Sequence, residues 1–383
     1  MFKTKIADWL KTKIDNWFKT KIAAAVCAAA LLFFPGCKRQ MAAQSEFVLG
    51  TVCSINLYEA GSAELYGTLF ARLRQLNDIF NNYSDSSEIT RVNQNAAAAP
   101  VPVSQDFFVV LKSALDFARL TGGAFDPTVG PLMKLWGFGK TPRVPSQEEI
   151  AAEKQLVGWQ YVALEGGEPK SVTDQNVAAA PASNDKGSQD QNPAAPPTVR
   201  FTKSGVRLDL GAIAKGYAAD CLVDILRERG VQRASLSLGG NVYVYGKKRG
   251  GSLWNVAIRN PEKPGQNSFM LKTKDATVVT SGAYERFFVQ DGKTYGHILD
   301  PATGFPAQSG LASVTIVSHN SMVADALSTS LFVLGKEKIP QIKNSALAGG
   351  FECVLVDENG AAYASEGLKG RLTALNGQVI NWF

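Results

Sequence analysis

Residues 207–220, RLDLGAIAKGYAAD, constrain the fold more than any other stretch of this 383-residue chain. The pattern predicts a short apolar strand that ends at Asp209, a turn at Gly211 and an alanine-rich helix from residue 213 to 226. Such a junction directs free backbone N–H groups at a ligand and favours an anion. Lys215 adds a positive charge in the first helical turn, so the segment suits a phosphate group.

Asp209 modifies this interpretation, because a carboxylate repels phosphate unless it binds a sugar hydroxyl, a base N–H or a metal ion. The combination with Lys215 therefore indicates a nucleotide with a divalent cation. An ordinary turn between a strand and a helix, with a solvated lysine, explains the same residues equally well. The segment alone does not decide between the two.

The charge of the chain is concentrated in its first residues. Residues 1–40 hold eight Lys or Arg and two Asp, which accounts for the whole formal net charge of +6. The rest of the sequence has no net charge and so lacks the excess of Lys and Arg that nucleic-acid binding requires. We therefore expect no nucleic-acid partner.

The first residues also predict export. Three copies of KTKI, at residues 3, 11 and 19, precede an apolar run over 22–34 that is too short to span a bilayer. Pro35, Gly36 and Cys37 then resemble a bacterial lipobox. We expect a lipoprotein-type signal peptide over 1–36, lipid on Cys37 that anchors the protein to a bacterial membrane, and a tether over 37–46. A plain signal sequence is the alternative, and either one takes the protein out of the cytoplasm.

The remaining chain reads as one α+β unit, with mixed or antiparallel sheets and flanking helices. We expect the catalytic domain over 47–375 and a C-terminal tail over 376–383. Residues 165–198 are rich in Gly, Ala, Pro, Asn, Asp and Ser, and they predict a disordered insertion between two strands. The helices are expected over 65–80, 107–120, 213–226 and 322–334, and strands over 47–58, 234–246, 254–259, 276–280, 287–290 and 312–317.

A second chemical site is predicted in the helix over 322–334, for which Ser321 is a suitable N-cap. Asp325, Ser328 and Thr329 follow helical spacing and share one face near the N-terminal end. One carboxylate and two hydroxyls are hard oxygen donors, which suit Mg²⁺. A capped helix with a polar stripe explains the same pattern.

Histidine and cysteine are scarce. Only His297 and His319 occur, and His297 lies in a Gly- and Pro-punctuated loop beside Asp300, where a base near neutral pH is plausible. Cys53, Cys221 and Cys353 stand in apolar settings, and they predict buried small side chains rather than disulfides or a zinc site.

Seven blocks, taken in order, resemble the ApbE family of FAD:protein FMN transferases. The resemblance covers about residues 47–370 apart from the insertion. The blocks are YSDSSEITRVN at 83–93, GAFDPTVGPL at 123–132, DLGAIAKGY at 209–217, LGGN at 238–241, TSGAYERF at 280–287, YGHILDPATG at 295–304 and ADALST at 324–329.

The resemblance implies a T-fold-like architecture and a lipoprotein outside the cytoplasm, on the periplasmic face of a bacterial membrane. It also implies a Mg²⁺-dependent enzyme that splits FAD between its phosphates. The enzyme would place FMN on a threonine or serine of an acceptor flavoprotein and release AMP. The side chains implied to contact FAD are Leu49, Tyr83, Ala124, Phe125, Asp126, Asp209, Lys215 and Ile298. The implied Mg²⁺ ligands are the carbonyl of Ala212 together with Asp325, Ser328 and Thr329.

Two positions depart from the family pattern. Ser328 stands where many relatives carry Asp, and Leu49 replaces a frequent Met. Tyr83 matches the aromatic residue of transferase members and favours transfer over hydrolysis.

His297 and Asp325 are the expected catalytic residues, with His297 as the base that takes the hydroxyl proton. Asp300 or a metal-bound water is the alternative base. Two other functions stay open: a Mg²⁺-dependent FAD pyrophosphatase that uses water in the same pocket, and a lipid-anchored FAD carrier without catalysis.

Overall fold

The computed structural model describes residues 42–383, apart from 59–61, 139 and 167–195. The predicted signal peptide over 1–36 and the lipidation site Cys37 lie outside the described residues. None of the described helices is both long and apolar enough to cross a membrane.

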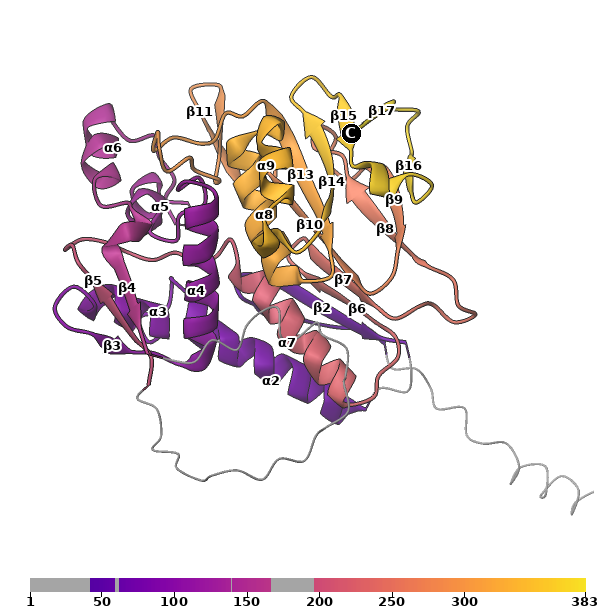
Figure 1. Cartoon of the computed structure of the whole chain (residues 1–383), viewed down its shortest axis with the longest axis horizontal. Helices are drawn as coiled ribbons and strands as arrows, with labels where there is room; N and C mark the ends of the chain where they lie inside the picture. The colour runs from indigo at the N-terminus through magenta and orange to yellow at the C-terminus, as the bar shows by residue number, and fades with distance from the viewer. Residues whose placement is uncertain (1–41, 59–61, 139, 167–195) are drawn as a thin grey trace, which may run out of the picture. The chain divides into compact units, whose positions relative to one another are not determined.

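A nine-stranded mixed sheet forms the centre of the domain (Figure 1). Its order is β1-β2-β6-β7-β10-β13-β14-β15-β17; neighbours pair antiparallel except β15 and β17, which pair parallel. The strands are β1 Gln44–Val48, β2 Thr51–Leu57, β6 Ala234–Leu238, β7 Asn241–Tyr245, β10 Ala276–Gly282, β13 Leu311–Ser318, β14 Glu352–Asp357, β15 Ala362–Ala364 and β17 Ile380–Trp382.

Three small sheets accompany the central one, in the orders β16-β9-β8, β3-β5-β4 and β11-β12. Their strands are β3 Val101–Pro102, β4 Val162–Glu165, β5 Thr198–Phe201, β8 Trp254–Arg259, β9 Asn267–Thr273, β11 Phe287–Gln290, β12 Lys293–Gly296 and β16 Leu372–Ala374. The sheet of β8, β9 and β16 packs on the central sheet through a cluster that includes Trp254, Phe269, Val278 and Val354.

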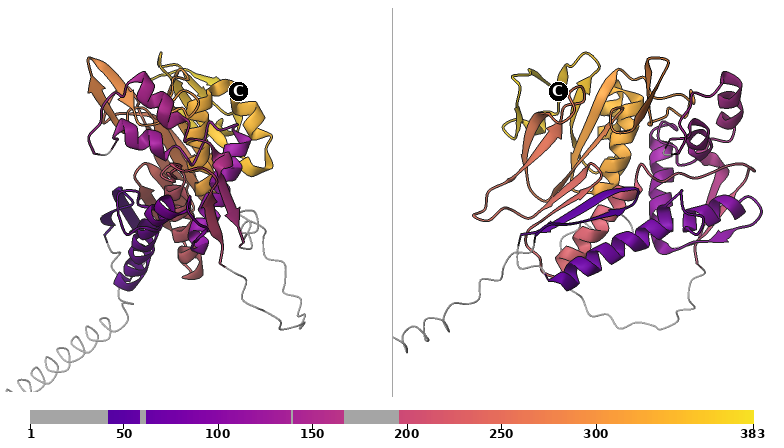
Figure 2. Two further views of the ribbon diagram at one scale, coloured as in Figure 1. Left: turned by 90° about the vertical axis from the view of Figure 1, so that its left-hand side faces the viewer. Right: turned by 180° about the vertical axis from the view of Figure 1, so that it is seen from behind.

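Helices α7 and α8 cover the middle strands of the central sheet (Figures 1 and 2). Helix α8 packs on β10 and β13, α7 packs on α8, and α2 packs on α7. The helices are α2 Ala63–Phe80, α3 Glu88–Asn95, α4 Gln105–Leu120, α5 Gly130–Trp136, α6 Gln147–Lys154, α7 Ala214–Glu228, α8 Ser321–Leu334 and α9 Ile339–Lys343.

Helices α2, α3, α4, α6 and α8 begin directly after a residue whose side chain caps the helix, whereas α5, α7 and α9 have no side-chain cap. Ser62 caps α2 by accepting a hydrogen bond from the N–H of Leu65 at 3.1 Å. The buried face of α2 includes Leu69 and Leu73, at helical spacing. Helix α8 is buried almost all round, because it lies between the sheet and α7.

This architecture confirms the predicted α+β class, but it moves the predicted boundaries. The domain was expected over 47–375, yet β1 begins at Gln44, and β17 lies within the supposed tail over 376–383 and pairs with β15. The insertion was expected over 165–198, but its two end residues belong to β4 and β5, which pair with each other. Residues 167–195 lie outside the described residues.

Two hairpins stand where single interrupted strands were predicted. Residues 47–58 form part of β1 and β2, joined at Leu49 and Gly50, and Leu49 has a φ of 55°. Residues 234–246 form β6 and β7. All three cysteines of the described part of the chain are free, and Cys53 and Cys353 are buried, as predicted, whereas Cys221 is only partly buried.

Candidate active site

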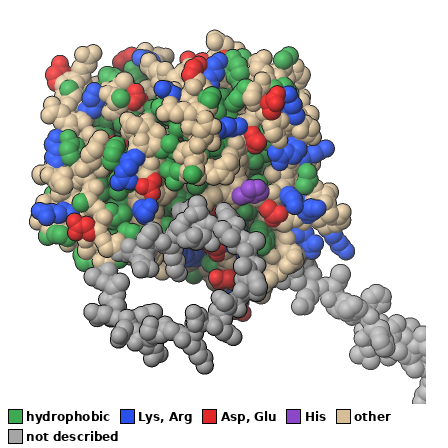
Figure 3. All heavy atoms as spheres, viewed as in Figure 1, with side chains coloured by type: hydrophobic (Ala, Val, Ile, Leu, Met, Phe, Trp, Pro, Cys, Tyr) green, Lys and Arg blue, Asp and Glu red, His purple; other side chains and the backbone are tan. Residues whose placement is uncertain are grey.

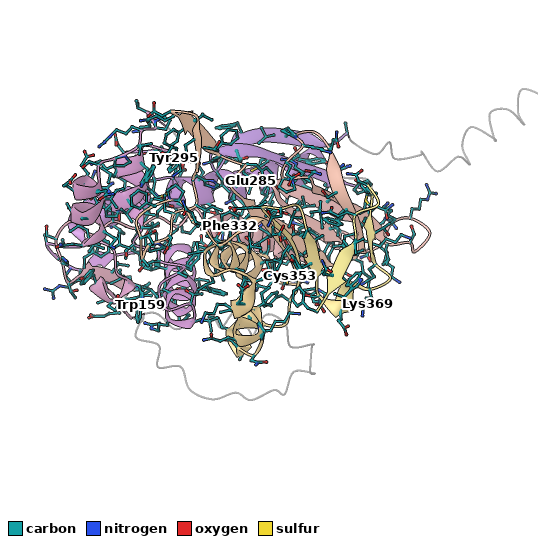
Figure 4. All side chains as sticks on the ribbon, turned by 90° about the horizontal axis from the view of Figure 1, so that it is seen from above. Trp159, Glu285, Tyr295, Phe332, Cys353 and Lys369 are labelled. Atoms are coloured by element: carbon teal, nitrogen blue, oxygen red, sulfur yellow. The ribbon has the colours of Figure 1, made fainter. Side chains whose placement is uncertain are left out.

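A cavity of about 250 Å³ opens where α7 and α8 meet the β1–β2 turn. Residues from the loop over 123–132, from the end of β10 and from the loop after β12 complete its wall. Glu285, which follows β10, lies between the β1–β2 hairpin and α8 in Figure 4.

The structure brings nearly all of the predicted site residues together in this cavity. The wall includes Leu49, Tyr83, Ala124, Phe125, Asp126, Asp209, Ala212, Lys215, His297, Ile298, Asp325 and Thr329. Only Ser328, among the predicted site residues of the described chain, is absent from it. Segments more than a hundred positions apart therefore form one site.

Helices α7 and α8 hold each other at their N-terminal ends. The N–H of Gly216 in α7 donates to Oδ2 of Asp325 in α8 at 2.9 Å. In return, Asp220 of α7 accepts hydrogen bonds from the N–H groups of Ser321 and Met322 at 2.9 and 2.8 Å. These carboxylates satisfy N–H groups that have no partner within their own helix. The pairing fixes Asp325 against the first turn of α7.

A glycine allows the two helices to approach this closely. A Cβ atom on Gly216 would lie 2.2 Å from the carbonyl oxygen of Ser321 and 2.7 Å from Cα of Met322. Both are main-chain atoms, so no side-chain rotation relieves the overlap. The contact sets the distance between the helices at the cavity.

The segment before α7 differs from its prediction. No strand ends at Asp209; instead, Arg207 makes one isolated parallel bridge to Val129, and the N–H of Asp209 donates to the carbonyl of Pro127 at 2.7 Å. Asn93 binds both backbone groups of Leu208, at 2.7 and 3.0 Å. Loop contacts, rather than a sheet, therefore place Asp209. The N-terminus of α7 is also partly occupied, because Asp325 takes the N–H of Gly216.

Burial raises the pKa of two aspartates in the cavity wall, Asp209 and Asp126. Asp209 accepts from the N–H of Gly211 at 2.8 Å, and its pKa is raised mainly by desolvation, against that hydrogen bond and the charge of Lys215. The pKa of Asp126 is raised for the same main reason, although it accepts hydrogen bonds from Thr128 and from the N–H of Trp159.

Asp325, Thr329 and the carbonyl of Ala212 fit a hard divalent cation, because all three offer oxygen and line the same cavity. Oδ2 of Asp325 lies 3.8 Å from Nζ of Lys215. Oδ1 accepts no hydrogen bond from the residues that the structure describes, which leaves it available to a ligand. Within that part of the chain no group of three or more His, Cys, Asp or Glu could hold a metal. A cation here would therefore depend on neutral oxygens and on the phosphates of a substrate.

Two predictions for α8 were wrong. Ser328 does not face the cavity: it is fully buried, and its Oγ donates to the carbonyl of Asp325 at 2.9 Å and bonds Ser281 Oγ at 2.8 Å. Ser321 is the first residue of α8 rather than its N-cap. Asn320 caps the helix, and its side chain accepts from the N–H of Val323 at 2.8 Å.

His297 is held in one tautomer. Its Nδ1 lies 3.1 Å from the carbonyl oxygen of Arg286, and because a carbonyl only accepts, Nδ1 carries the proton and Nε2 is the free acceptor. Burial first, and then the charges of Arg286 and Lys215, lower the pKa of His297 to about 4. The alternative base Asp300 is not part of the cavity wall, and its Oδ1 accepts from the N–H of Ala302 at 2.8 Å.

Several wall residues were given no chemical role from the sequence, among them Glu285, Arg286 and Asn241. Asn241 is almost fully buried, and its Oδ1 accepts hydrogen bonds from Ser321 and Thr277 at 3.0 and 3.1 Å. The motifs that contain these residues, at 238–241 and 280–287, were recognised in the sequence. Nothing in the sequence said that these blocks face the cavity.

Glu285 lines the cavity, and we expect it to make the affinity for a phosphate ligand depend on pH. Burial raises its pKa to about 7, against the charges of Lys215 and Arg259. The group is therefore neutral below about pH 7 and becomes negative above it, so we expect FAD to bind several-fold more weakly at pH 8 than at pH 6. Flavin fluorescence titrations at a fixed Mg²⁺ concentration measure this. In Glu285→Gln the dependence should vanish; an equal pH dependence in that variant would show that another group is responsible.

The protein has an α+β fold, and one cavity holds Lys215, the buried carboxylate of Asp325 and neutral oxygen donors. This combination suits the phosphates of a nucleotide. The chain belongs to the ApbE family, whose model matches residues 49–355.

Curated relatives support this family over most of the chain. This chain is 34% identical to the FAD:protein FMN transferase of Treponema pallidum, over 88% of this chain and 90% of that protein. It is 30% identical to the FAD:protein FMN transferase of Vibrio cholerae, over 90% of this chain and 97% of that protein.

Solved structures agree. The crystal structure of the ApbE protein from Thermotoga maritima superposes with a TM-score of 0.71 at 33% sequence identity. The superposition covers 86% of this chain and 98% of the Thermotoga chain. The flavin transferase ApbE from Vibrio cholerae gives a TM-score of 0.69 at 29% identity, with the same coverage. The predicted family is therefore confirmed.

Proposed function

We propose that this protein is an FAD:protein FMN transferase that moves FMN from FAD to a serine or threonine hydroxyl of an acceptor flavoprotein and releases AMP. The observation that carries the proposal is the single cavity in which Asp209, Lys215, His297 and Asp325 meet. The names of the curated relatives support the activity. FAD is the substrate, and the acceptor flavoprotein is the second partner.

The bonds made and broken define what the site must do. The acceptor oxygen attacks the phosphorus on the FMN side, and the bond from that phosphorus to the oxygen bridging to the AMP phosphate breaks. AMP leaves with the bonding electrons, and the hydroxyl proton must go to a base. Nε2 of His297 is free to take it, because Nδ1 is engaged by the carbonyl of Arg286.

The charge on the two phosphates must also be compensated. Lys215 supplies one positive charge, held in place by its hydrogen bond to the carbonyl of Gly211 at 2.7 Å. Asp325, Thr329 and the carbonyl of Ala212 would hold Mg²⁺, which when bound would neutralise phosphate charge. Ser328 would act only through its hydrogen bond to the carbonyl of Asp325.

The place of action follows from the first residues of the sequence. We propose that the protein is a lipoprotein with lipid on Cys37, tethered to a bacterial membrane and acting outside the cytoplasm. The basic repeats, the short apolar run over 22–34 and the small residue before Cys37 support this. Labelling with a radioactive fatty acid, compared between the wild-type protein and Cys37→Ala, tests it; equal labelling would contradict the anchor.

One incubation tests the activity. The protein is mixed with FAD, Mg²⁺ and extracytoplasmic flavoprotein subunits, and the products are examined by flavin fluorescence in a denaturing gel and by chromatography of AMP. We expect fluorescence fixed on an acceptor, with AMP released. Free FMN and AMP without a labelled acceptor would instead identify a pyrophosphatase, and unchanged FAD would identify a carrier.

A further inference from the structure

The β11–β12 hairpin has one packed face and one bare apolar face. Phe288 packs into an aromatic cluster, with ring centroids 5.6 Å from Phe138 and 6.4 Å from Trp136. Phe287 and Val289, on the opposite face of β11, are 53% and 59% exposed. In the described part of the chain β11 pairs only with β12, so its outer edge also has unpaired backbone groups.

This hairpin stands at the cavity. Glu285 and Arg286, which line the cavity, directly precede β11, and His297, which also lines it, directly follows β12. A molecule that lies on Phe287 and Val289 is therefore next to the predicted base.

A second bare apolar pair stands on the neighbouring hairpin. Phe47 of β1 and Val52 of β2 are cross-strand partners, exposed by 77% and 58%, and the turn between them lines the cavity. The guanidinium of Arg286 donates to the carbonyl of Gly50 at 3.0 Å and ties the two hairpins together. Phe47, Val52, Phe287 and Val289 are called the rim residues below. Each hairpin therefore presents an exposed apolar pair beside the cavity, and exposed apolar side chains next to a site can serve as an interaction surface.

We propose that the rim residues bind the acceptor flavoprotein, through an extended apolar segment that carries the serine or threonine to be modified. The inference rests on the proposed function. A protein hydroxyl can reach a phosphorus inside a cavity of about 250 Å³ only if its flanking residues lie across the mouth. Apolar side chains and a free strand edge suit such a segment, because strand addition supplies main-chain hydrogen bonds and alternate side chains supply contacts.

The same placement argues against two other occupants. A membrane surface or a second copy of this chain seated on the rim residues would cover the mouth and shut out the acceptor. On the face that Figure 3 shows, Lys and Arg side chains are interspersed among Asp and Glu, and the sequence outside residues 1–40 has no formal net charge, whereas an anionic membrane favours a basic surface.

The test uses the full chain and an acceptor subunit that the wild-type protein labels. Phe287→Asp/Val289→Asp should raise the KM for the acceptor at least tenfold, while kcat at saturating acceptor and the Kd for FAD stay unchanged. Val379→Asp is the matched control, because Val379 is 76% exposed and lies outside the cavity wall; it should behave as the wild type. An unchanged thermal unfolding midpoint shows that each variant is folded.

An unchanged KM for the acceptor in the double variant would overturn the inference and leave the proposed function standing. Loss of binding to anionic phospholipid vesicles, or a changed oligomeric mass, with an unchanged KM would assign the rim residues to a membrane or to a second copy. If the wild-type protein labels no acceptor, the proposed function itself fails, and this inference fails with it.

Discussion

Asp325→Ala is expected to abolish both products, with FMN transfer and AMP release each reduced by about a thousand-fold. The carboxylate is almost fully buried, accepts the N–H of Gly216 and lies 3.8 Å from Nζ of Lys215. Its removal deletes the only charged group among the proposed cation ligands and the carboxylate that faces Lys215. The two products are measured together, by flavin fluorescence on the acceptor and by chromatography of AMP.

The control for this variant is Asp224→Ala. Asp224 lies on α7, outside the cavity wall, and pairs with Arg227 at 2.6 Å at the surface. We expect its activity to stay within about twofold of the wild type, because exposed ion pairs contribute little. Full turnover by Asp325→Ala would refute the assignment of this carboxylate to the site.

Gly216→Ala should reduce the free energy of unfolding by about 3 kcal/mol, at the upper end of what overpacking costs. The new Cβ would meet main-chain atoms of Ser321 and Met322 at 2.2 and 2.7 Å, so α7 and α8 must separate. The helical preference of alanine over glycine, roughly 1 kcal/mol, does not offset this. Since Asp325 moves with α8, FMN transfer should fall as well. Urea unfolding and the transfer assay measure the two effects.

Gly67→Ala is the matched control in a helix. Gly67 lies on the exposed side of α2, and a Cβ there meets nothing within 4 Å. This substitution should stabilise the protein by up to about 1 kcal/mol and leave transfer unchanged. If Gly216→Ala were equally stabilising, the close approach of the two helices would not exist as described.

Local patterns predicted much of the fold, because they report interactions between near neighbours. The periodicity over 65–80 and 322–334 predicts α2 and α8, and each helix starts within two residues of the expected position. The alternation over 254–259 predicts β8 with its bounds. The apolar stretch before Asp209 was wrongly predicted to be a strand, because hydrogen bonds to the remote residues Asn93 and Pro127 hold it as a loop: the Asn93 side chain bonds both backbone groups of Leu208, and the carbonyl of Pro127 accepts from the N–H of Asp209.

The site could be predicted only as far as motifs name its residues. Helical spacing puts Ser328 near Asp325, but it does not say which side chain turns to the sheet; Ser281 of β10 engages Ser328 there. The pKa of Glu285 is raised by burial in the folded protein, which the sequence does not show. The hydrogen bonds of Asp220 and Asp325 to the N–H groups of the opposite helix form only when α7 and α8 are packed together. Contacts between distant segments leave no local trace in the sequence.

A crystal structure of the protein with FAD and Mg²⁺ tests the central claim most directly. We expect the two phosphates at the junction of α7 and α8, with a cation between them and the carboxylate of Asp325, and the flavin against Tyr83. Phosphates bound elsewhere, with the junction empty, would contradict the account.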